Sequence, residues 1–229
     1  MPEQYSTIGQ LNEQSLHAAV KQWYAGKNSL LEAKLEGYFI DILNDNEVIE
    51  IQTRNFGSIK KKLDYLTDKY PVKLVYPIPT KKWIVHYTED MTKQIRKRRS
   101  PKKGKLTDLF DELIRIPHIV KKKNFCMEVL FHEQEEIRCD DGKGSWRRKG
   151  VSIKDRRLVK VSDTLTFKKP GDYRRFIPGD IAASFTNKQL ASSCKIPVEK
   201  ARKLTYCLDK IGVITKTGKK GNAIIYKLV

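Results

Sequence analysis

The segment from Asp41 to Gln52 constrains the fold most, because its residues fit a β-hairpin with two carboxylates on one face. Asp45 and Asn46 suit a two-residue turn. With that turn, Asp41 lies directly opposite Glu50, and their Cβ atoms are roughly 4.5 to 5.5 Å apart. Like charges in this position destabilise a sheet, and a divalent cation with oxygen ligands would offset them. The segment therefore predicts a hairpin that can hold a metal ion.

The residues around the two carboxylates indicate that the hairpin is buried. Apolar side chains occur on both strands, at Tyr38, Ile40, Ile42, Val48, Ile49 and Ile51. We expect such a hairpin to be buried on at least one face, where a carboxylate is seldom kept without a partner. An acidic residue at each end of a short exposed hairpin is also common, so the spacing alone leaves a plain surface hairpin open.

The charge of the chain predicts a polyanionic partner. Lys and Arg number 46 against 27 Asp and Glu, which gives a formal net charge of +19 over 229 residues. Nucleic acid is the polyanion most often bound by such a surface, through release of counterions. An anionic membrane is the rival, but no apolar run of about 18 residues and no signal peptide occurs. We therefore expect a cytoplasmic protein with no membrane contact.

The four cysteines predict free thiols rather than disulfides or a metal site. They are widely spaced and form no C-x-x-C pair, at Cys126, Cys139, Cys194 and Cys207. In a cytosolic protein such cysteines are expected to be reduced and packed in cores. A zinc site from His118, Cys126, His132 and Cys139 is the alternative, although the spacing matches no zinc finger or ribbon.

Apolar periodicity in the first 87 residues predicts the order helix, strand, strand, helix, strand, strand. The expected elements are a helix over 11–24, strands over 38–43 and 47–53, a helix from about 58 to 70, and strands over 72–78 and 83–87. A short helix over 106–116 and a strand pair over 125–138 and 158–167 follow. Together these patterns predict a mixed α/β (α+β) fold.

Two basic segments interrupt the pattern. The first is residues 91–105, with Arg96, Arg98 and Arg99, and it is expected to be a linker. The second is a glycine-rich loop over 142–150 that contains Arg147 and Arg148. Runs of like charge are usually solvated, and either segment could also clamp a phosphate backbone.

The last fifty residues predict a winged helix-turn-helix. Thr186 can cap a helix over 187–193, and Pro197 suits the first turn of a second helix. A hairpin over 213–226 completes the pattern and carries Lys219 and Lys220. We expect Lys200, Arg202 and Lys203 on the open side of the second helix, where a recognition helix meets the major groove. Docking to another protein is the alternative use of such a module.

The hairpin and its flanking elements resemble the PD-(D/E)XK, or restriction-endonuclease-like, nuclease superfamily. The resemblance covers residues 11–87, with Asp41 as the first carboxylate and Glu50-Ile51-Gln52 as the second motif. The upstream acid of the family would be Glu13 or Glu32. The stretch from Leu16-His17 to Val75-Tyr-Pro-Ile78 is similar to an uncharacterised bacterial group of that superfamily. The resemblance implies a mixed sheet flanked by helices and hydrolysis of phosphodiesters.

The resemblance also implies roles for individual residues. Asp41, Glu50 and the carbonyl of Ile51 would bind Mg²⁺, with Mn²⁺ as a substitute. Gln52 stands where the family usually has lysine; it can orient a water molecule but supplies no positive charge. Lys62 or Lys21 could supply that charge, or both are ordinary surface residues. His17 shares a helical stripe with Glu13 and could face the site, or the two form a surface pair.

Two functions from different classes remain open. The first is a Mg²⁺-dependent endonuclease that a winged helix brings to double-stranded DNA, and the second is an inactive DNA-binding regulator or assembly protein with a nuclease-like core. RNA ranks third, because no RNA-binding aromatic signature occurs. The expected division is a nuclease-like core over 1–90, a basic linker over 91–105, a middle region over 106–178 and the winged helix-turn-helix over 179–229. A homodimer remains open.

Overall fold

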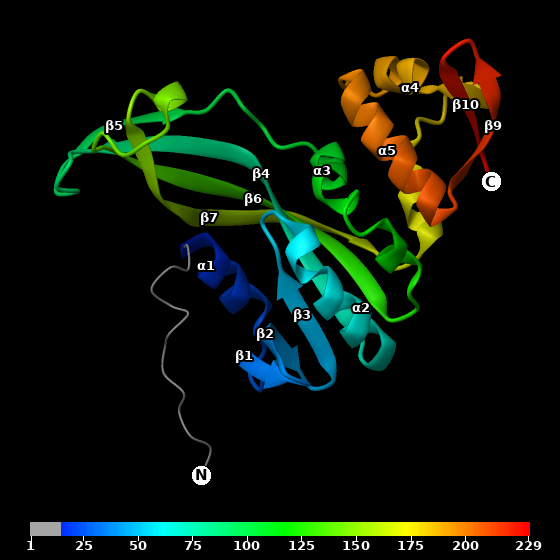
Figure 1. The fold of residues 1–229 in the computed structure, drawn as a ribbon. Coiled ribbons are helices and arrows are strands. Elements are labelled where there is room, and N and C mark those ends of the chain that lie inside the picture. Colours follow the sequence, from blue (N-terminus) through cyan, green and yellow to red (C-terminus); the bar gives the residue numbers. More distant parts are fainter. Residues whose placement is uncertain (1–14) are drawn as a thin grey trace. The chain divides into compact units, whose positions relative to one another are not determined.

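The computed structural model describes residues 15–229, which divide into two compact units. Unit 1 comprises the described residues up to Lys27 together with Pro79–Gly104 and Phe131–Asp163. Unit 2 comprises Asn28–Ile78, Lys105–Leu130 and Thr164–Val229. Three long strands contribute residues to both units, namely β4 (Val72–Tyr87), β6 (Phe125–Asp140) and β7 (Val151–Phe167) (Figure 1).

Unit 2 contains the predicted hairpin as part of a mixed sheet. Its first elements are β1 (Leu30–Leu35), β2 (Tyr38–Asn44), β3 (Glu47–Ile51) and α2 (Lys60–Lys69), which follows a 3₁₀ turn over Phe56–Ile59. The strand order is β1-β2-β3-β4-β6-β7. β2 pairs antiparallel with β1 and β3, whereas β3 pairs parallel with β4. A parallel pair needs a crossover connection, and α2 provides it.

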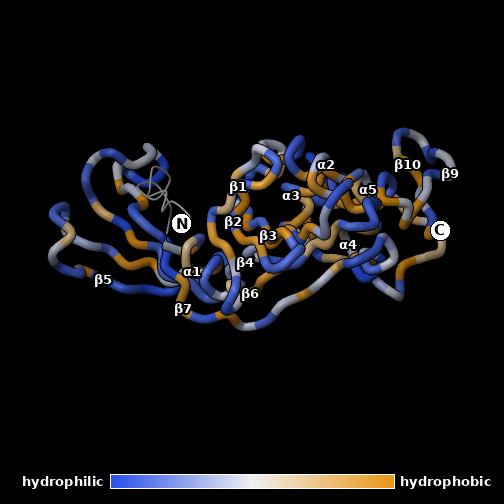
Figure 2. The backbone as a smooth tube through the Cα atoms, turned by 90° about the horizontal axis from the view of Figure 1, so that it is seen from below, coloured by the Kyte–Doolittle hydropathy of each residue, from blue (hydrophilic) through white to orange (hydrophobic). Residues whose placement is uncertain are grey.

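The core of unit 2 explains why these segments form this sheet. Ile40 and Ile42 alternate along β2, and both are fully buried. In α2, the buried residues Leu63 and Leu66 are three positions apart and lie on one face of the helix. Hydrophobic residues accordingly follow β2 and β3 in the tube of Figure 2. The predicted α/β class with a mixed sheet and flanking helices is confirmed at this level.

The C-terminal part of unit 2 has the predicted order of two helices and a hairpin. Its elements are β8 (Ser184–Thr186), α4 (Asn187–Ser193), α5 (Val198–Ile211), β9 (Ile214–Lys220) and β10 (Ala223–Leu228). The short helix α3 (Leu109–Leu113), from the middle of the chain, packs against α5. The strands form a separate sheet in the order β8-β10-β9. Thr186 caps α4 by accepting a hydrogen bond from the Gln189 amide, as predicted. α5 ends at Gly212, whose φ of 93° suits glycine at a helix C-terminus.

Unit 1 consists of α1 (Ser15–Tyr24), β5 (Gln94–Arg99), a 3₁₀ turn over Trp146–Arg148, and the parts of β4, β6 and β7 that lie in it. β5 pairs antiparallel with the end of β4, from Trp83 opposite Arg99 to Tyr87 opposite Gln94. The start of α1 is tied to β7 because Ser15 donates to Asp155 through its amide (3.1 Å) and its hydroxyl (2.6 Å). No helix in residues 15–229 combines the length and apolar character needed to span a membrane.

The structure differs from the sequence-based expectations in three elements. The expected linker over 91–105 contains β5, and β1 had no counterpart among the expected strands. The two strands expected over 72–78 and 83–87 are one strand, β4. All four cysteines are free thiols, as predicted.

Candidate functional site

The predicted carboxylate pair forms at one end of the β2–β3 hairpin. Asn44 pairs with Glu47 and Ile42 with Ile49, so the same register places Asp41 opposite Glu50. The turn between the strands bends through Asp45, whose φ of 47° is tolerated by an Asx residue. The predicted juxtaposition of the two carboxylates is therefore present in the structure.

Each carboxylate accepts a hydrogen bond from the backbone of the opposite strand. The amide of Ile51 donates to Oδ2 of Asp41 (2.8 Å), and the amide of Asp41 donates to Oε1 of Glu50 (3.4 Å). The backbone pairing of the two strands ends one residue earlier, at Ile42 and Ile49. Side-chain oxygens thus take the place of backbone acceptors here, which fixes the orientation of both carboxylates.

Glu50 is the buried member of the pair, with a relative exposure of 1%. Burial and, next, the charge of Asp41 together raise the pKa of Glu50 to about 7, even though Lys62 opposes both effects. A cation that approaches such a carboxylate stabilises its ionised form. The site is therefore poised to bind positive charge.

Lys62 supplies that charge in the structure. Its Nζ lies 2.6 Å from Oε1 of Glu50 and 2.5 Å from the carbonyl oxygen of Phe39, to which it donates a hydrogen bond. The side chain is only 15% exposed. The interpretation of Lys62 as an ordinary surface residue is therefore wrong. The signal was present in the sequence, because Ile59, Lys62 and Leu66 share one helical face.

A polar cluster anchors α2 and thereby positions Lys62. The carboxylate of Glu36, in the turn between β1 and β2, accepts hydrogen bonds from Tyr65 (2.9 Å), Lys69 (3.1 Å) and Tyr70 (3.2 Å). The hydrogen bond from Tyr65 is the largest of the effects that lower the pKa of Glu36. Since Tyr65 and Lys69 belong to α2, the cluster holds that helix against the turn between β1 and β2, and β2 pairs with the strand that carries Glu50.

The other predicted catalytic residues have varied placements. Gln52 directly follows β3 and is half-buried, and its backbone N–H donates a hydrogen bond to the carbonyl oxygen of Val75 (2.9 Å). Glu32 lies on β1, has a φ of 51° and is exposed. The residues on either side of it pair with Ile42 and Ile40, so Glu32 stands opposite Asp41. His17 lies on α1 in unit 1, whereas the carboxylate pair lies in unit 2. Glu13 lies outside the described residues.

The carboxylate pair offers a cation two side-chain ligands. No group of three or more His, Cys, Asp or Glu side chains in residues 15–229 is placed to hold a metal ion. The four residues of the alternative zinc site, His118, Cys126, His132 and Cys139, therefore form no such group. Any further oxygen ligand at the pair would come from the backbone, such as the Ile51 carbonyl, from water or from a substrate.

The basic residues on α5 are not arranged as predicted. Lys200 forms ion pairs with Asp108 and with Asp111 (2.9 Å), and Lys203 pairs with Asp111 (2.8 Å). These carboxylates belong to the segment that forms α3, which packs against α5. The expectation that Lys200 and Lys203 lie on an open face is therefore wrong. Arg202, by contrast, is exposed.

The remaining predicted basic residues are more accessible. Lys219 and Lys220 are exposed at the end of β9. Arg96, Arg98 and Arg99 are exposed on β5. Arg147 is exposed and Arg148 is half-buried, both in the 3₁₀ turn of unit 1.

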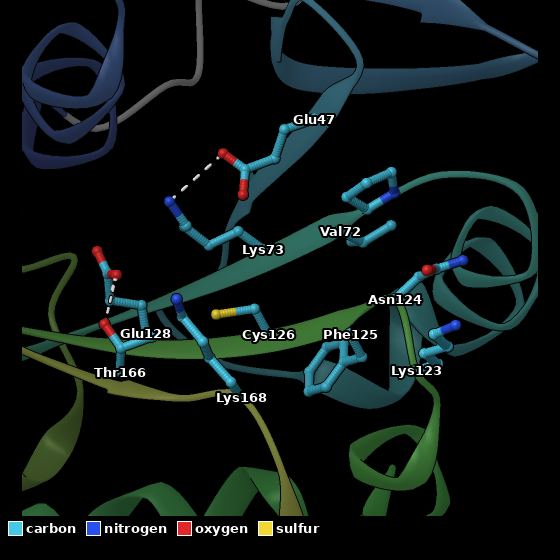
Figure 3. A pocket seen from close by; sticks show the side chains of 11 residues that line it. Glu47, Val72, Lys73, Lys123, Asn124, Phe125, Cys126, Glu128, Thr166 and Lys168 are labelled. Atoms are coloured by element: carbon cyan, nitrogen blue, oxygen red, sulfur yellow. Dashed lines mark hydrogen bonds and ion pairs between the residues drawn. The ribbon is translucent and has the colours of Figure 1, made fainter.

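A depression of about 450 Å³ in unit 2 lies on the other face of the sheet from the carboxylate pair (Figure 3). Lys73 lines it and pairs with Ile49 across the strands, whereas Glu50 pairs with Leu74, so the two side chains point to opposite faces. Glu47 and Lys73 form an ion pair in it (3.4 Å). Burial raises the pKa of the Cys126 thiol there to about 11, so this thiol is a poor nucleophile near neutral pH.

Comparisons with known proteins add a family but no activity. The chain is 26% identical over 227 residues to a protein of Treponema pallidum (strain Nichols) described as an uncharacterized protein, covering 96% of this chain and 87% of that protein. No solved structure matches. Residues 14–168, more than half of the chain, match the family described as a domain of unknown function, DUF8091. This chain belongs to the DUF8091 family.

Proposed function

We propose that this protein is a cytoplasmic, metal-dependent endodeoxyribonuclease that hydrolyses phosphodiester bonds in double-stranded DNA. The observation that carries the proposal is the buried Glu50 carboxylate opposite Asp41, with Lys62 2.6 Å away. Two facing carboxylates and a lysine are the groups that a restriction-endonuclease-like site needs. The order β2, β3, α2, β4 with a parallel β3–β4 pair supports the same proposal.

The chemistry of the pair suits Mg²⁺. Mg²⁺ in nucleic-acid enzymes is commonly held by one or two carboxylates and completes its shell with water and phosphate oxygens. Asp41, Glu50 and the Ile51 carbonyl would hold the ion, and Mn²⁺ would substitute for it. When bound, the ion would lower the pKa of a coordinated water and neutralise charge on the phosphate.

The remaining residues would supply positive charge, orient the attacking water and contact DNA. Lys62 would supply the positive charge that Gln52 lacks, because it already neutralises a buried carboxylate at this point. The Gln52 amide would orient the attacking water by hydrogen bonding. The helices and hairpin of the C-terminal part suit a winged helix, and exposed Arg202, Lys219 and Lys220 are the residues that would contact DNA.

Plasmid nicking tests the proposal. The protein is incubated with supercoiled plasmid and Mg²⁺ or Mn²⁺, and the open circular form is measured over time. We expect nicking by the wild type and a loss of roughly 100-fold or more in Asp41→Asn and in Glu50→Gln, because each removes a metal ligand. Lys62→Ala should also lose activity.

Matched controls come from the same elements. Asp45→Asn and Glu47→Gln change acidic residues of the same hairpin, and Lys61→Ala changes an exposed lysine of α2. All three should nick like the wild type. A wild type that binds plasmid but never nicks it would overturn the proposal. It would favour the inactive DNA-binding protein, in which the Lys62–Glu50 ion pair only stabilises the fold.

A further inference from the structure

A second depression, of about 350 Å³, lies wholly within unit 1, and half of the residues that line it are basic. Five basic side chains from β4, β5, β6 and the two adjoining turns surround one carboxylate, that of Glu136; they are Lys82, Arg98, Lys102, Arg138 and Arg148. A cavity with this lining attracts an anion, because like charges that are held together raise the local positive potential.

The single carboxylate does not neutralise the cluster. Glu136 is 3% exposed and pairs with Arg138 (2.5 Å) and Lys82 (3.2 Å). Burial raises the pKa of Glu136, but these two partners outweigh burial and hold the pKa below its usual value. Glu136 is therefore ionised and is engaged by the cations at the base of the pocket.

Three further cations line the same pocket. Within residues 15–229, Arg98, Lys102 and Arg148 form no ion pair with a carboxylate. Arg148 is oriented by a hydrogen bond from its Nε to the carbonyl of Val151 (3.1 Å). Arg98 and Lys102 are exposed. These three side chains are thus available to an anionic group that enters from solvent.

The pocket opens onto a strand that is itself basic. All six residues of β5 are exposed, and four of them in succession are basic, from Arg96 to Arg99. β5 pairs with β4 and with no other strand in the part of the chain that the structure describes. Lys97 pairs with Glu135 (2.6 Å), while Arg96 and Arg98 share one face of β5 because side chains alternate along a strand. Basic residues thus continue beyond the pocket along that face, which suits a polymer of phosphates better than a single small anion.

The wider surface of unit 1 has the same character. Its described residues contain 20 Lys and Arg and 9 Asp and Glu, a formal charge of 20 minus 9, or +11. Trp146, in the 3₁₀ turn, is 83% exposed, and the guanidinium of Arg147 lies 5.5 Å from its ring centre. That turn is drawn beside β5 in Figure 1. An exposed aromatic ring among cations is typical of surfaces that contact nucleic acid.

We propose that the unit 1 pocket binds a phosphodiester of a nucleic-acid backbone that runs along β5. Arg98, Lys102 and Arg148 contact the phosphate oxygens, and Arg96, which lies on the same face of β5 as Arg98, contacts a neighbouring phosphate. Such contacts hold the backbone without reading its sequence. The choice of DNA as the nucleic acid rests on the proposed function.

A binding assay without divalent metal tests this inference. Fluorescence anisotropy of a short fluorescein-labelled DNA duplex is measured in EDTA over a range of salt concentrations. Arg98→Ala/Lys102→Ala should weaken binding roughly tenfold, and should lower the salt slope by about 1 for each phosphate that the variant no longer neutralises. Both side chains are exposed, so the variant should keep the melting temperature of the wild type.

The control has the same change in charge elsewhere. Lys34→Ala/Lys121→Ala removes two exposed lysines from unit 2, outside the proposed winged helix, and should bind nearly like the wild type. Equal losses in both double variants would overturn the inference. The inference would also be overturned if binding to phosphatidylserine vesicles required Arg98 and Lys102 while binding to DNA did not. Because no cleavage occurs in EDTA, the binding assay and the nicking assay can fail separately. If the wild type nicks plasmid but the Arg98→Ala/Lys102→Ala variant binds DNA normally, only the pocket is refuted. If the wild type does not nick plasmid but that variant binds DNA more weakly, only the nuclease is refuted.

Discussion

Glu50 is buried, and burial disfavours its ionised form. Lys62 offsets the negative charge of Glu50, which has little contact with solvent. Burial and Asp41 raise the pKa of Glu50 to about 7, even though Lys62 opposes them. An enzyme can use such a carboxylate, because a cation that reaches it meets little competition from water. Two consequences can be measured without any substrate.

Replacing Glu50 with glutamine should remove a pH dependence of stability. The usual pKa of the group is 4.5, so the folded state holds this proton more tightly than the unfolded chain does. Between pH 4.5 and about 7 the free energy of unfolding of the wild type should therefore fall as pH rises, by on the order of 2 kcal/mol. Urea denaturation across this range measures it. Glu47→Gln should keep the fall, and a Glu50→Gln variant that also keeps it would contradict the account.

Removing Lys62 should destabilise the protein in a pH-dependent way. Lys62→Met leaves the Glu50 carboxylate buried without its cation, which should cost about 2 to 3 kcal/mol at pH 8. At pH 5 the cost should be smaller, because Glu50 then carries a proton. Thermal or urea unfolding of Lys62→Met and of Lys61→Met, an exposed neighbour, makes the comparison. Equal stabilities of the two variants at pH 8 would mean that the ion pair contributes nothing.

At the scale of elements, the sequence predicts those helices and strands that apolar periodicity and turn residues specify. The β2–β3 hairpin follows from the Asp45–Asn46 turn and from alternating isoleucines, and it brings Asp41 and Glu50 together as expected. β5 is different: its run of four basic residues has no apolar alternation, and it is held by backbone pairing with β4 and by the ion pair of Lys97 with Glu135. Which of several lysines on a helix points inward also depends on tertiary packing, as Lys62 illustrates.

The ion pairs between α3 and α5 show the same limit and lead to a further prediction. Lys200 and Lys203 pair with Asp111, and although burial raises the pKa of Asp111, hydrogen bonds from these two lysines lower it overall. Lys200→Ala and Lys203→Ala should each cost roughly 0.5 to 1 kcal/mol of stability and leave DNA affinity nearly unchanged.

Arg202→Ala provides the matched comparison on the same helix. Its side chain is exposed, so its removal should leave stability within about 0.5 kcal/mol of the wild type and weaken DNA binding measurably. Anisotropy and urea denaturation on the three variants separate the effects. A loss of affinity in Lys203→Ala as large as that in Arg202→Ala would mean that the ion pairs open when DNA binds.

At the scale of the whole molecule, the net charge is +19, and the number of phosphates that its basic residues neutralise sets how binding responds to salt. The charge is carried by both units, with +11 in the described part of unit 1 alone. If six or more phosphates are neutralised, the affinity for duplex DNA should fall about 10³-fold or more between roughly 50 and 200 mM salt. Anisotropy titrations measure the slope, and an affinity that does not change with salt would contradict a phosphate-contacting role for β5.

The proposed function depends on the binding of a divalent cation by Asp41 and Glu50 together. Crystals of the wild type soaked in Mn²⁺ and measured for anomalous scattering test it directly. We expect one anomalous peak between the two carboxylates and the Ile51 carbonyl, and no such peak in crystals of Asp41→Asn soaked in the same way. A soak that leaves no peak there, with Lys62 still paired to Glu50, would contradict it.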